Sequence, residues 1–279
     1  MLLAFDVGNT NIVAGVFENG ELLQFWRMQT SQTKSADEYG IMITSMFERE
    51  GLKITDVKDI IIASVAPSML YTLQHLARKY FDKTAIIVGP GIKTGLIVKY
   101  DNPKQLGADR IVNSVGALAK YPAPLIIIDY GTATTFCAVS DKSEYLGGAI
   151  MPGIKIGAEA LVQRTAALPR IEIESPGKVI CRNTVDGMQA GIVYSNVGMT
   201  EYVVARMKKE IAEYTGCDKP VTVIATGGLS TLIASETDCI DVVDKELTMH
   251  GLQVLFEKNK HLSGNQKNKK FDEEDEGVY

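Results

Sequence analysis

The chain has 279 residues, of which 46% are hydrophobic and 23% are charged, and its formal net charge is −5. These values are typical of a globular protein with one or two domains. The acidic balance argues against nucleic acid as a partner, because contacts with a phosphate backbone require a clustered basic surface.

The sequence does not predict a membrane protein. No apolar stretch reaches the roughly 18 residues that a spanning helix requires. The N-terminus lacks the basic segment of a signal peptide, and its first apolar run ends at once in Asp6. We therefore expect a cytoplasmic protein.

The cysteines and histidines are scattered along the chain and form no CxxC pair. They stand at Cys137, Cys181, Cys217, Cys239, His75, His250 and His261. This spacing predicts neither a zinc site nor a disulfide framework, and the histidines are too sparse for a metal cluster or a Ser–His–Asp triad.

The first half of the chain is predicted to begin with three strands and then to alternate helices with strands. Asn19-Gly20 lies between two β-rich runs and is a strong hairpin signal. Tyr39, Ile43 and Phe47 recur at helical spacing, and Gly51 follows as a stop. The expected elements are strands at 2–6, 12–17 and 22–28, a helix at 35–50, a strand at 59–65, a helix at 67–81, a strand at 85–88 and a helix at 107–121.

The second half repeats this order loosely, starting at residue 124. Its expected elements are strands at 124–129, 135–139 and 144–150, helices at 153–163 and 184–215, strands at 221–225 and 240–243, and a helix at 247–257. The duplicated order βββαβαβα predicts an α/β protein with two mixed central sheets flanked by helices. We expect one domain at 1–116, a second at 117–262, and a charged, disordered tail at 263–279.

A short acidic turn occurs twice, each time between two β-rich runs. The first is Asp6-Val7-Gly8-Asn9-Thr10, and the second is Asp129-Tyr130-Gly131-Thr132-Ala133-Thr134-Thr135. Glycine allows a tight turn and lets a ligand approach the backbone. Exposed N–H groups and Thr hydroxyls suit phosphate oxygens, and an Asp can hold a hydrated Mg²⁺. Two such turns predict two related halves that grip one nucleotide.

A third turn, Thr226-Gly227-Gly228-Leu229-Ser230, follows a buried strand and opens a helix. Consecutive glycines allow a base or ribose to lie against the backbone, and the new helix N-terminus can face phosphate. Alone, this pattern is more often a simple strand-to-helix turn. Together with the two acidic turns it indicates a nucleotide site.

The segment Gly107-Ala108-Asp109-Arg110 places an acid beside a base at a predicted helix start. In isolation it could be a capped helix with a surface ion pair. A kinase, however, needs a carboxylate to orient the attacking hydroxyl and a cation to hold an anionic substrate, and Asp109 and Arg110 are of these types. Tyr100 is a candidate pocket wall, and Thr184 is either a helix cap or a substrate contact.

Together and in this order, these motifs resemble the type III pantothenate kinases. That family belongs to the superfamily of acetate kinase, sugar kinases, actin and the heat-shock chaperone ATPases. Asp-x-Gly-x-Thr alone marks the superfamily weakly, whereas Gly-Ala-Asp-Arg followed by Asp-x-Gly-Thr-Ala-Thr-Thr is specific to the family. The matching segments are Asp6–Thr10, Gly107–Arg110, Asp129–Thr135, Gly147–Gly153 and Thr226–Gly228, and the resemblance extends to about His261.

The resemblance implies two ribonuclease-H-like domains of the actin-like ATPase type. It also implies ATP-dependent phosphorylation of the primary hydroxyl of pantothenate to 4′-phosphopantothenate, the first step of coenzyme A biosynthesis. Family members are homodimers that use Mg²⁺ with ATP and a monovalent cation, K⁺ or NH₄⁺. The helix from Thr184 is a candidate for the dimer contact.

Site roles also follow from the resemblance. Asp109 would be the general base, Asp6 would organise Mg²⁺-ATP, and Asp129 would help to bind the monovalent cation. The implied ATP and phosphate contacts are Asp6, Gly8, Asn9, Thr10, Asn11, Gly131, Thr132, Thr134, Gly227 and Gly228. The implied pantothenate contacts are Tyr100, Gly107, Asp109, Arg110 and Thr184.

Two alternatives remain open from the sequence. The phosphate turns read only ATP, so a kinase of another small hydroxyl or carboxylate acceptor fits them equally well. A non-catalytic regulatory relative should have lost Asp6, Asp109 or Asp129, and all three are present. Tyr130 occupies a variable slot, where a bulky side chain would pack inward or shape the cation site.

Overall fold

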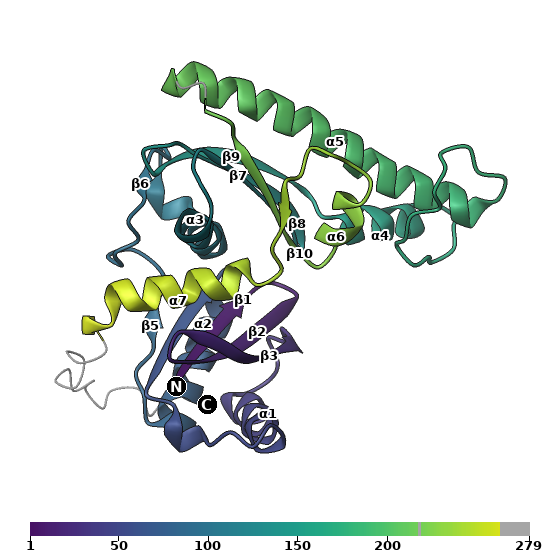
Figure 1. The fold of residues 1–279 in the computed structure, drawn as a ribbon. Helices are drawn as coiled ribbons and strands as arrows, with labels where there is room; N and C mark the ends of the chain where they lie inside the picture. Colours follow the sequence, from purple (N-terminus) through teal and green to yellow (C-terminus); the bar gives the residue numbers. More distant parts are fainter. Residues whose placement is uncertain (217–218, 263–279) are drawn as a thin grey trace.

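The structure is a computed structural model that describes residues 1–216 and 219–262. Two lobes, each built around one β-sheet, lie one above the other (Figure 1). The predicted tail at 263–279 and Cys217 lie outside the described residues.

The lower lobe holds a mixed five-stranded sheet in the order β3-β2-β1-β4-β5. Its strands are β1 (Leu2–Val7), β2 (Asn11–Glu18), β3 (Glu21–Gln29), β4 (Asp59–Ser64) and β5 (Ile86–Ile87). Its helices are α1 (Ala36–Arg49), the 3₁₀ turn η1 (Ile54–Asp56) and α2 (Pro67–Phe81). β1 runs parallel to β4 and antiparallel to β2, and the hairpin from β2 to β3 closes at Asn19-Gly20 with positive φ at both residues, as the sequence predicts.

The upper lobe holds a six-stranded sheet in the order β11-β10-β7-β8-β9-β6. Its strands are β6 (Ile97–Val98), β7 (Leu125–Tyr130), β8 (Ala133–Val139), β9 (Glu144–Pro152), β10 (Thr222–Gly227) and β11 (Val242–Val243). The remaining helices are η2 (Pro103–Gln105), α3 (Ala108–Lys120), α4 (Ile154–Arg164), α5 (Thr184–Thr215), α6 (Ser230–Ala234) and α7 (Leu247–Asn259). The order β9-β8-β7-β10-β11 repeats that of the lower sheet, which confirms the predicted α/β duplication with mixed sheets.

Several helices begin or end at capping residues that can be recognised in the sequence. Ser35 and Glu38 form a capping box at the start of α1, and Asn183 accepts a hydrogen bond from the Asp186 N–H at the start of α5. α5 ends at Gly216, whose φ of 61° is left-handed. These signals account for the agreement with the predicted helix bounds.

Differences from the predicted elements are confined to sheet edges and one short turn. β5 and β11 are edge strands that pair through only two residues each, so both are shorter than predicted. β6 was not predicted; it adds to β9 at the edge of the upper sheet. α6 has only five residues, so the helix after Thr226–Ser230 is a single turn with little dipole to offer a phosphate.

Two elements pack in the lobe opposite to the one that their place in the sequence suggests. β6 precedes residue 116 in the chain but joins the upper sheet, and α7 follows the upper strands but packs on the lower sheet. In Figure 1, α7 lies across the junction between the lobes. One apolar cluster there joins Ala4 and Ile61 of the lower sheet to Val112 of α3 and Leu252 of α7. The division at residues 116 and 117 stays a prediction.

The contact between α3 and α7 depends on two glycines. A Cβ at Gly251 would collide with the carbonyl oxygen of Val112, and one at Gly116 would lie 2.7 Å from the carbonyl oxygen of Leu247. Because backbone rather than flexible side chain fills the space, the two helices can approach only where both residues lack a side chain.

Gly251→Ala is therefore expected to destabilise the protein by about 1–3 kcal/mol through overpacking against α3. Ser45→Ala is the control: Ser45 is exposed within α1, away from the contact between α3 and α7, so the change should leave the stability within about 0.5 kcal/mol of that of the wild type. Urea unfolding of both variants tests this. Equal midpoints for the two would contradict the packing role of Gly251.

Candidate active site

The two acidic turns meet between the lobes. The Thr10 hydroxyl lies 2.9 Å from the Thr132 hydroxyl, within hydrogen-bond distance, although the residues are 122 positions apart. A backbone hydrogen bond from the glycine closes each turn. Gly8 N–H donates to the Asn11 carbonyl, three residues on, at 2.9 Å, and Gly131 N–H donates to the Ala133 carbonyl, two residues on, at 3.2 Å. The duplication therefore places two related hairpin turns, of different length, face to face around one site.

Three carboxylates converge on this site. Asp6 and Asp129 are the next-to-last residues of β1 and β7, and Asp109 lies in the first turn of α3. Burial, followed by the negative charges of Asp129 and Asp109, raises the pKa of Asp6 to about 7. Burial and the charge of Asp109 raise the pKa of Asp129 to about 6. The fold therefore concentrates negative charge that its own cations do not balance, which is typical of a site that receives a metal ion.

Asp109 itself is also shifted. Burial raises the pKa of its carboxyl, and the N–H of Arg110, which donates to Asp109 Oδ1 at 2.8 Å, partly opposes that rise. A carboxylate with a raised pKa is a better proton acceptor than an exposed one. Gly107 caps the helix, and a Cβ there would collide with Asp109 Oδ1.

A polar chain fixes the orientation of Asp129. Asn113 Nδ2 on α3 donates to Asp129 Oδ2 at 3.1 Å, and Asn113 Oδ1 accepts from the Thr248 hydroxyl of α7 at 2.7 Å. Thr135 of β8 pairs directly with Asp129 of β7, so the two side chains lie on the same face of the sheet. Asn113 carried no motif, and only the packing of α3 against β7 shows its role.

Arg110 lies in an aromatic pocket of the upper lobe. The side chain is buried, its Nε donates to Cys137 Sγ at 3.4 Å, and its guanidinium carbon lies 5.8 Å from the Tyr100 ring centroid and 5.7 Å from that of Tyr145. Its Nη2 has no hydrogen-bond partner among the described residues. A buried cation with an unused donor suits an anionic group on a substrate. The sequence did not single out Cys137 or Tyr145.

Glycines let the surrounding turns approach the phosphate turns closely. A Cβ at Gly153 would collide with the Thr132 carbonyl oxygen, so the start of α4 rests directly on the second turn. Gly227 has a φ of 91°, and a Cβ there would lie 2.6 Å from Asp129 Oδ1. The third predicted turn therefore lies against the second.

Two predicted contacts are placed differently from the rest. Thr134 is fully buried, and its hydroxyl has no hydrogen-bond partner among the described residues. Thr184 starts α5 at the end of the upper lobe away from α3 (Figure 1).

Tyr130 packs inward, where its hydroxyl lies 2.9 Å from that of Thr200 on α5. By contrast, the turn residues Asn9, Thr10, Asn11, Gly131 and Thr132 are exposed.

The donor set fits a divalent ion delivered with a nucleotide. Among residues 1–216 and 219–262, no group of three or more His, Cys, Asp or Glu side chains could hold a metal by itself. Mg²⁺ is ordinarily held by one or two carboxylates together with substrate phosphates and water, and Asp6 beside the Thr10 turn provides such a partial site.

The fold and this site define an ATP-dependent kinase built on the actin-like ATPase fold. A model of the type III pantothenate kinase family matches residues 2–206, and the chain belongs to that family. The enzyme is accordingly a pantothenate kinase of type III, which uses ATP with a divalent metal.

Solved structures agree with the fold. A protein of the Baf transcriptional activator family from Campylobacter jejuni aligns with a TM-score of 0.58 and 18% identity, over 93% of this chain and 99% of that one. A Sinorhizobium meliloti protein assigned as a 2-dehydro-3-deoxygalactonokinase gives 0.57 and 13%, over 96% and 100%. MreB 5 of Spiroplasma citri, solved with AMPPNP, gives 0.52 and 10%, over 94% and 97%. At these identities the likeness concerns the fold alone.

Within the described residues, none of the helices has the length and apolar character needed to span a bilayer.

The raised pKa of Asp6 predicts a trade between stability and function. An unfolded Asp titrates near 3.8 and folded Asp6 near 7, so the ligand-free protein loses stability as the pH rises from about 4 to about 7. Asp6→Asn is expected to remove this loss and to stabilise the ligand-free protein at pH 8 by about 2 kcal/mol, while abolishing turnover.

Urea unfolding at pH 5 and pH 8 measures this effect. The gain from Asp6→Asn should be larger at pH 8 than at pH 5, whereas Asp56→Asn, at an exposed carboxylate on η1, should show no such difference. Parallel pH profiles for Asp6→Asn and the wild type would contradict the assignment of Asp6 as a buried, charge-coupled group.

Proposed function

We propose that the enzyme transfers the γ-phosphoryl group of ATP to the primary hydroxyl of pantothenate and releases 4′-phosphopantothenate, the first step of coenzyme A biosynthesis. One observation carries the proposal: Asp109, with its raised pKa, stands beside the buried, partly unpaired guanidinium of Arg110. A proton acceptor next to an anion site matches an acceptor molecule that has a hydroxyl at one end and a carboxylate at the other.

The proposed roles follow from where the groups lie. Arg110, with Tyr100 and Gly107, holds the acceptor carboxylate and aims its hydroxyl at Asp109. The hydroxyl oxygen forms a bond to the γ-phosphorus while the bond from that phosphorus to the ADP oxygen breaks, and the hydroxyl proton passes to Asp109. Positioning provides most of the acceleration, because phosphoryl transfer requires little covalent chemistry from the protein.

The nucleotide would lie across the facing turns. Asp6 and the exposed residues of the first turn, with Gly131 and Thr132 of the second, would face the phosphates, and Gly227 and Gly228 would face the adenosine. Mg²⁺ bound with ATP at Asp6 would neutralise phosphate charge. The raised pKa of Asp129 supports a nearby monovalent cation, K⁺ or NH₄⁺, since a cation there would offset the buried negative charge.

Release of ADP by the purified protein tests the acceptor and the cation together. With ATP and Mg²⁺, we expect turnover that depends on pantothenate and is faster with K⁺ than with Na⁺. Turnover with a sugar or acetate but not with pantothenate would replace the acceptor. Equal rates in K⁺ and Na⁺ would remove the cation role from Asp129.

Asp109→Asn is the matched variant for this assay. The amide keeps the shape of the side chain but cannot take a proton, so kcat should fall by about 10²- to 10⁴-fold while ATP affinity stays near that of the wild type. Asp56→Asn serves again as the exposed control and should leave kcat unchanged. Normal turnover by Asp109→Asn would remove Asp109 from the role of general base.

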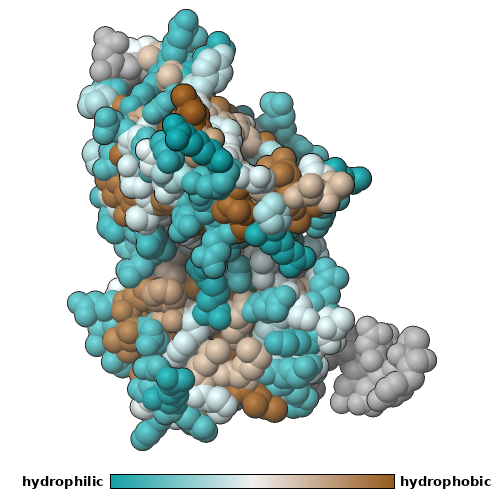
Figure 2. Space-filling view, turned by 90° about the vertical axis from the view of Figure 1, so that its right-hand side faces the viewer, coloured by the Kyte–Doolittle hydropathy of each residue, from teal (hydrophilic) through white to brown (hydrophobic). Residues whose placement is uncertain are grey.

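We also propose that the enzyme is a homodimer formed through the α4–α5 face. Of the 14 exposed large hydrophobic residues in the described part of the chain, eight lie between residues 150 and 214, among them Ile180 at 88% and Tyr202 at 67% exposure. Hydrophobic residues are exposed among hydrophilic ones on this lobe (Figure 2). Such a concentration is typical of an interaction surface.

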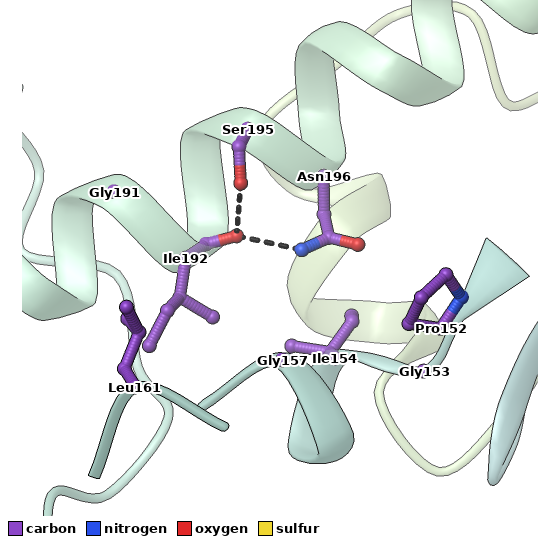
Figure 3. A pocket seen from close by; sticks show the side chains of 9 residues that line it. All are labelled: Pro152, Gly153, Ile154, Gly157, Leu161, Gly191, Ile192, Ser195 and Asn196. Atoms are coloured by element: carbon purple, nitrogen blue, oxygen red, sulfur yellow. Dashed lines mark hydrogen bonds between the residues drawn. The ribbon is translucent and has the colours of Figure 1, made fainter. Parts of the chain in front are cut away.

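A groove on the same face supports this assignment. It encloses about 180 Å³ between α4 and α5. Figure 3 shows its lining: Pro152, Gly153, Ile154, Gly157, Leu161, Gly191, Ile192, Ser195 and Asn196. Nothing surrounds the Cβ positions of Gly157 and Gly191, so another helix could approach the backbone closely there. Docking of a second copy would also allow Thr184 to reach an acceptor that its own chain does not bring near.

Light scattering of the purified protein should therefore give about twice the 30.4 kDa mass of one chain. Tyr202→Glu is expected to shift the protein towards monomer, because it places a charge in the apolar face of α5. Tyr71→Glu, at an equally exposed tyrosine on α2, should leave the mass unchanged. A monomeric wild type would refute the homodimer.

A further inference from the structure

Arg27 lies in one row with Asp6 across the lower sheet. Asp6 pairs with Val13 on β2, and Val13 pairs with Arg27 on β3. Directly paired residues of neighbouring strands present their side chains on the same face. Arg27 therefore lies on the face that carries Asp6, two strands away, or about 10 Å between the backbones.

Helix α7 packs against this face, where Val13 of the same row joins the apolar cluster that contains Met249 and Leu252 of α7. In the next row on this face, where Gly15 pairs with Ala4, a Cβ at Gly15 would lie 2.7 Å from Met249 Sδ of α7. Arg27, in contrast, is exposed, and it makes no hydrogen bond or ion pair with any described residue. A long cationic side chain thus stands beside the phosphate turns with no hydrogen bond or ion pair to the part of the chain that the structure describes.

The same side chain extends towards the upper lobe. Arg27 Nη1 lies 3.9 Å from the position that a Cβ at Gly228 would take, and its charge acts on Asp6, where it opposes the rise in pKa. Arg27 therefore lies between the first acidic turn and the glycine turn after β10. These are the two places where the nucleotide phosphates and the adenosine are proposed to lie.

The charge balance of the site calls for such a cation. Asp6, Asp109 and Asp129 are all acidic, and ATP brings further negative charge. Arg110 is enclosed by Tyr100 and Tyr145 on the acceptor side of Asp109. Backbone N–H groups and a metal ion can balance part of the charge, but a guanidinium can also donate two parallel hydrogen bonds to phosphate oxygens.

We propose that Arg27 binds the phosphate chain of ATP and bridges the two lobes across it. This inference rests on the proposed function only in that ATP is the phosphoryl donor. Because ADP and ATP carry the phosphates that Arg27 would contact beyond the α position, its contribution should be large for them and small for AMP.

Arg27→Met, which keeps length but removes charge, tests the proposal by titration of the ligand-free enzyme with nucleotides and Mg²⁺ in the absence of an acceptor. We expect the Kd of ATP to rise about 10- to 100-fold, the range for hydrogen bonds between charged groups, and the Kd of AMP to change by less than about threefold. Arg27→Lys should recover part of the ATP affinity, since it restores charge but not bidentate geometry. Arg49→Met, at an exposed arginine in the last turn of α1, is the charge control and should match the wild type.

Two outcomes would overturn the proposal. Unchanged ATP affinity in Arg27→Met would show that the guanidinium does not touch phosphate. Equal losses for ATP and AMP would show that Arg27 acts on the adenosine side or on the fold, and a lowered melting temperature would distinguish the latter. Since the titration needs no acceptor, failure of pantothenate as substrate would appear in the turnover assay and leave this test intact.

Discussion

The structure depends on the burial of three carboxylates close to one another. Asp6, Asp109 and Asp129 come from different elements. Burial raises the pKa of all three, the charges of Asp129 and Asp109 add to the rise at Asp6, and the charge of Asp109 adds to the rise at Asp129. Such a cluster is unfavourable in the isolated protein and becomes favourable when cations enter it. The stability of the ligand-free enzyme and its capacity to bind metal and nucleotide are therefore opposed at the same atoms.

The rest of the architecture holds these carboxylates in place. Parallel pairing of β1 with β4 and of β7 with β10 fixes the strands that carry Asp6 and Asp129 inside both sheets. α3 connects the sheets, and α7 packs against α3 through glycines that admit only backbone. A change of angle between the lobes would thus move the two phosphate turns relative to each other, which would couple closure around a substrate to chemistry.

The two sides of Asp109 have different chemical character. On one side, the phosphate turns are exposed, rich in hydroxyl and backbone groups, and lie opposite Arg27. On the other, Arg110 is buried among Tyr100, Tyr145 and Cys137. The guanidinium of Arg110 is buried and needs an anionic partner from the substrate. An anionic acceptor is therefore favoured, because an uncharged acceptor would leave the buried charge of Arg110 uncompensated.

The sequence alone determined the duplicated fold and the identity of the turns, because alternation, hairpin residues and helix caps are local signals that tertiary contacts reinforced. It also located Asp6, Asp109 and Asp129 through their motifs. Only the tertiary structure decided which side chains surround them. Asn113 and Arg27 carry no motif, and their places follow from helix packing and strand register. In the same way, Thr134 lies within the second motif but is buried, because its strand turns that side chain away from Asp129. The contact between the Thr10 and Thr132 hydroxyls joins residues 122 positions apart. It forms only when the two sheets dock, and no local sequence pattern encodes it.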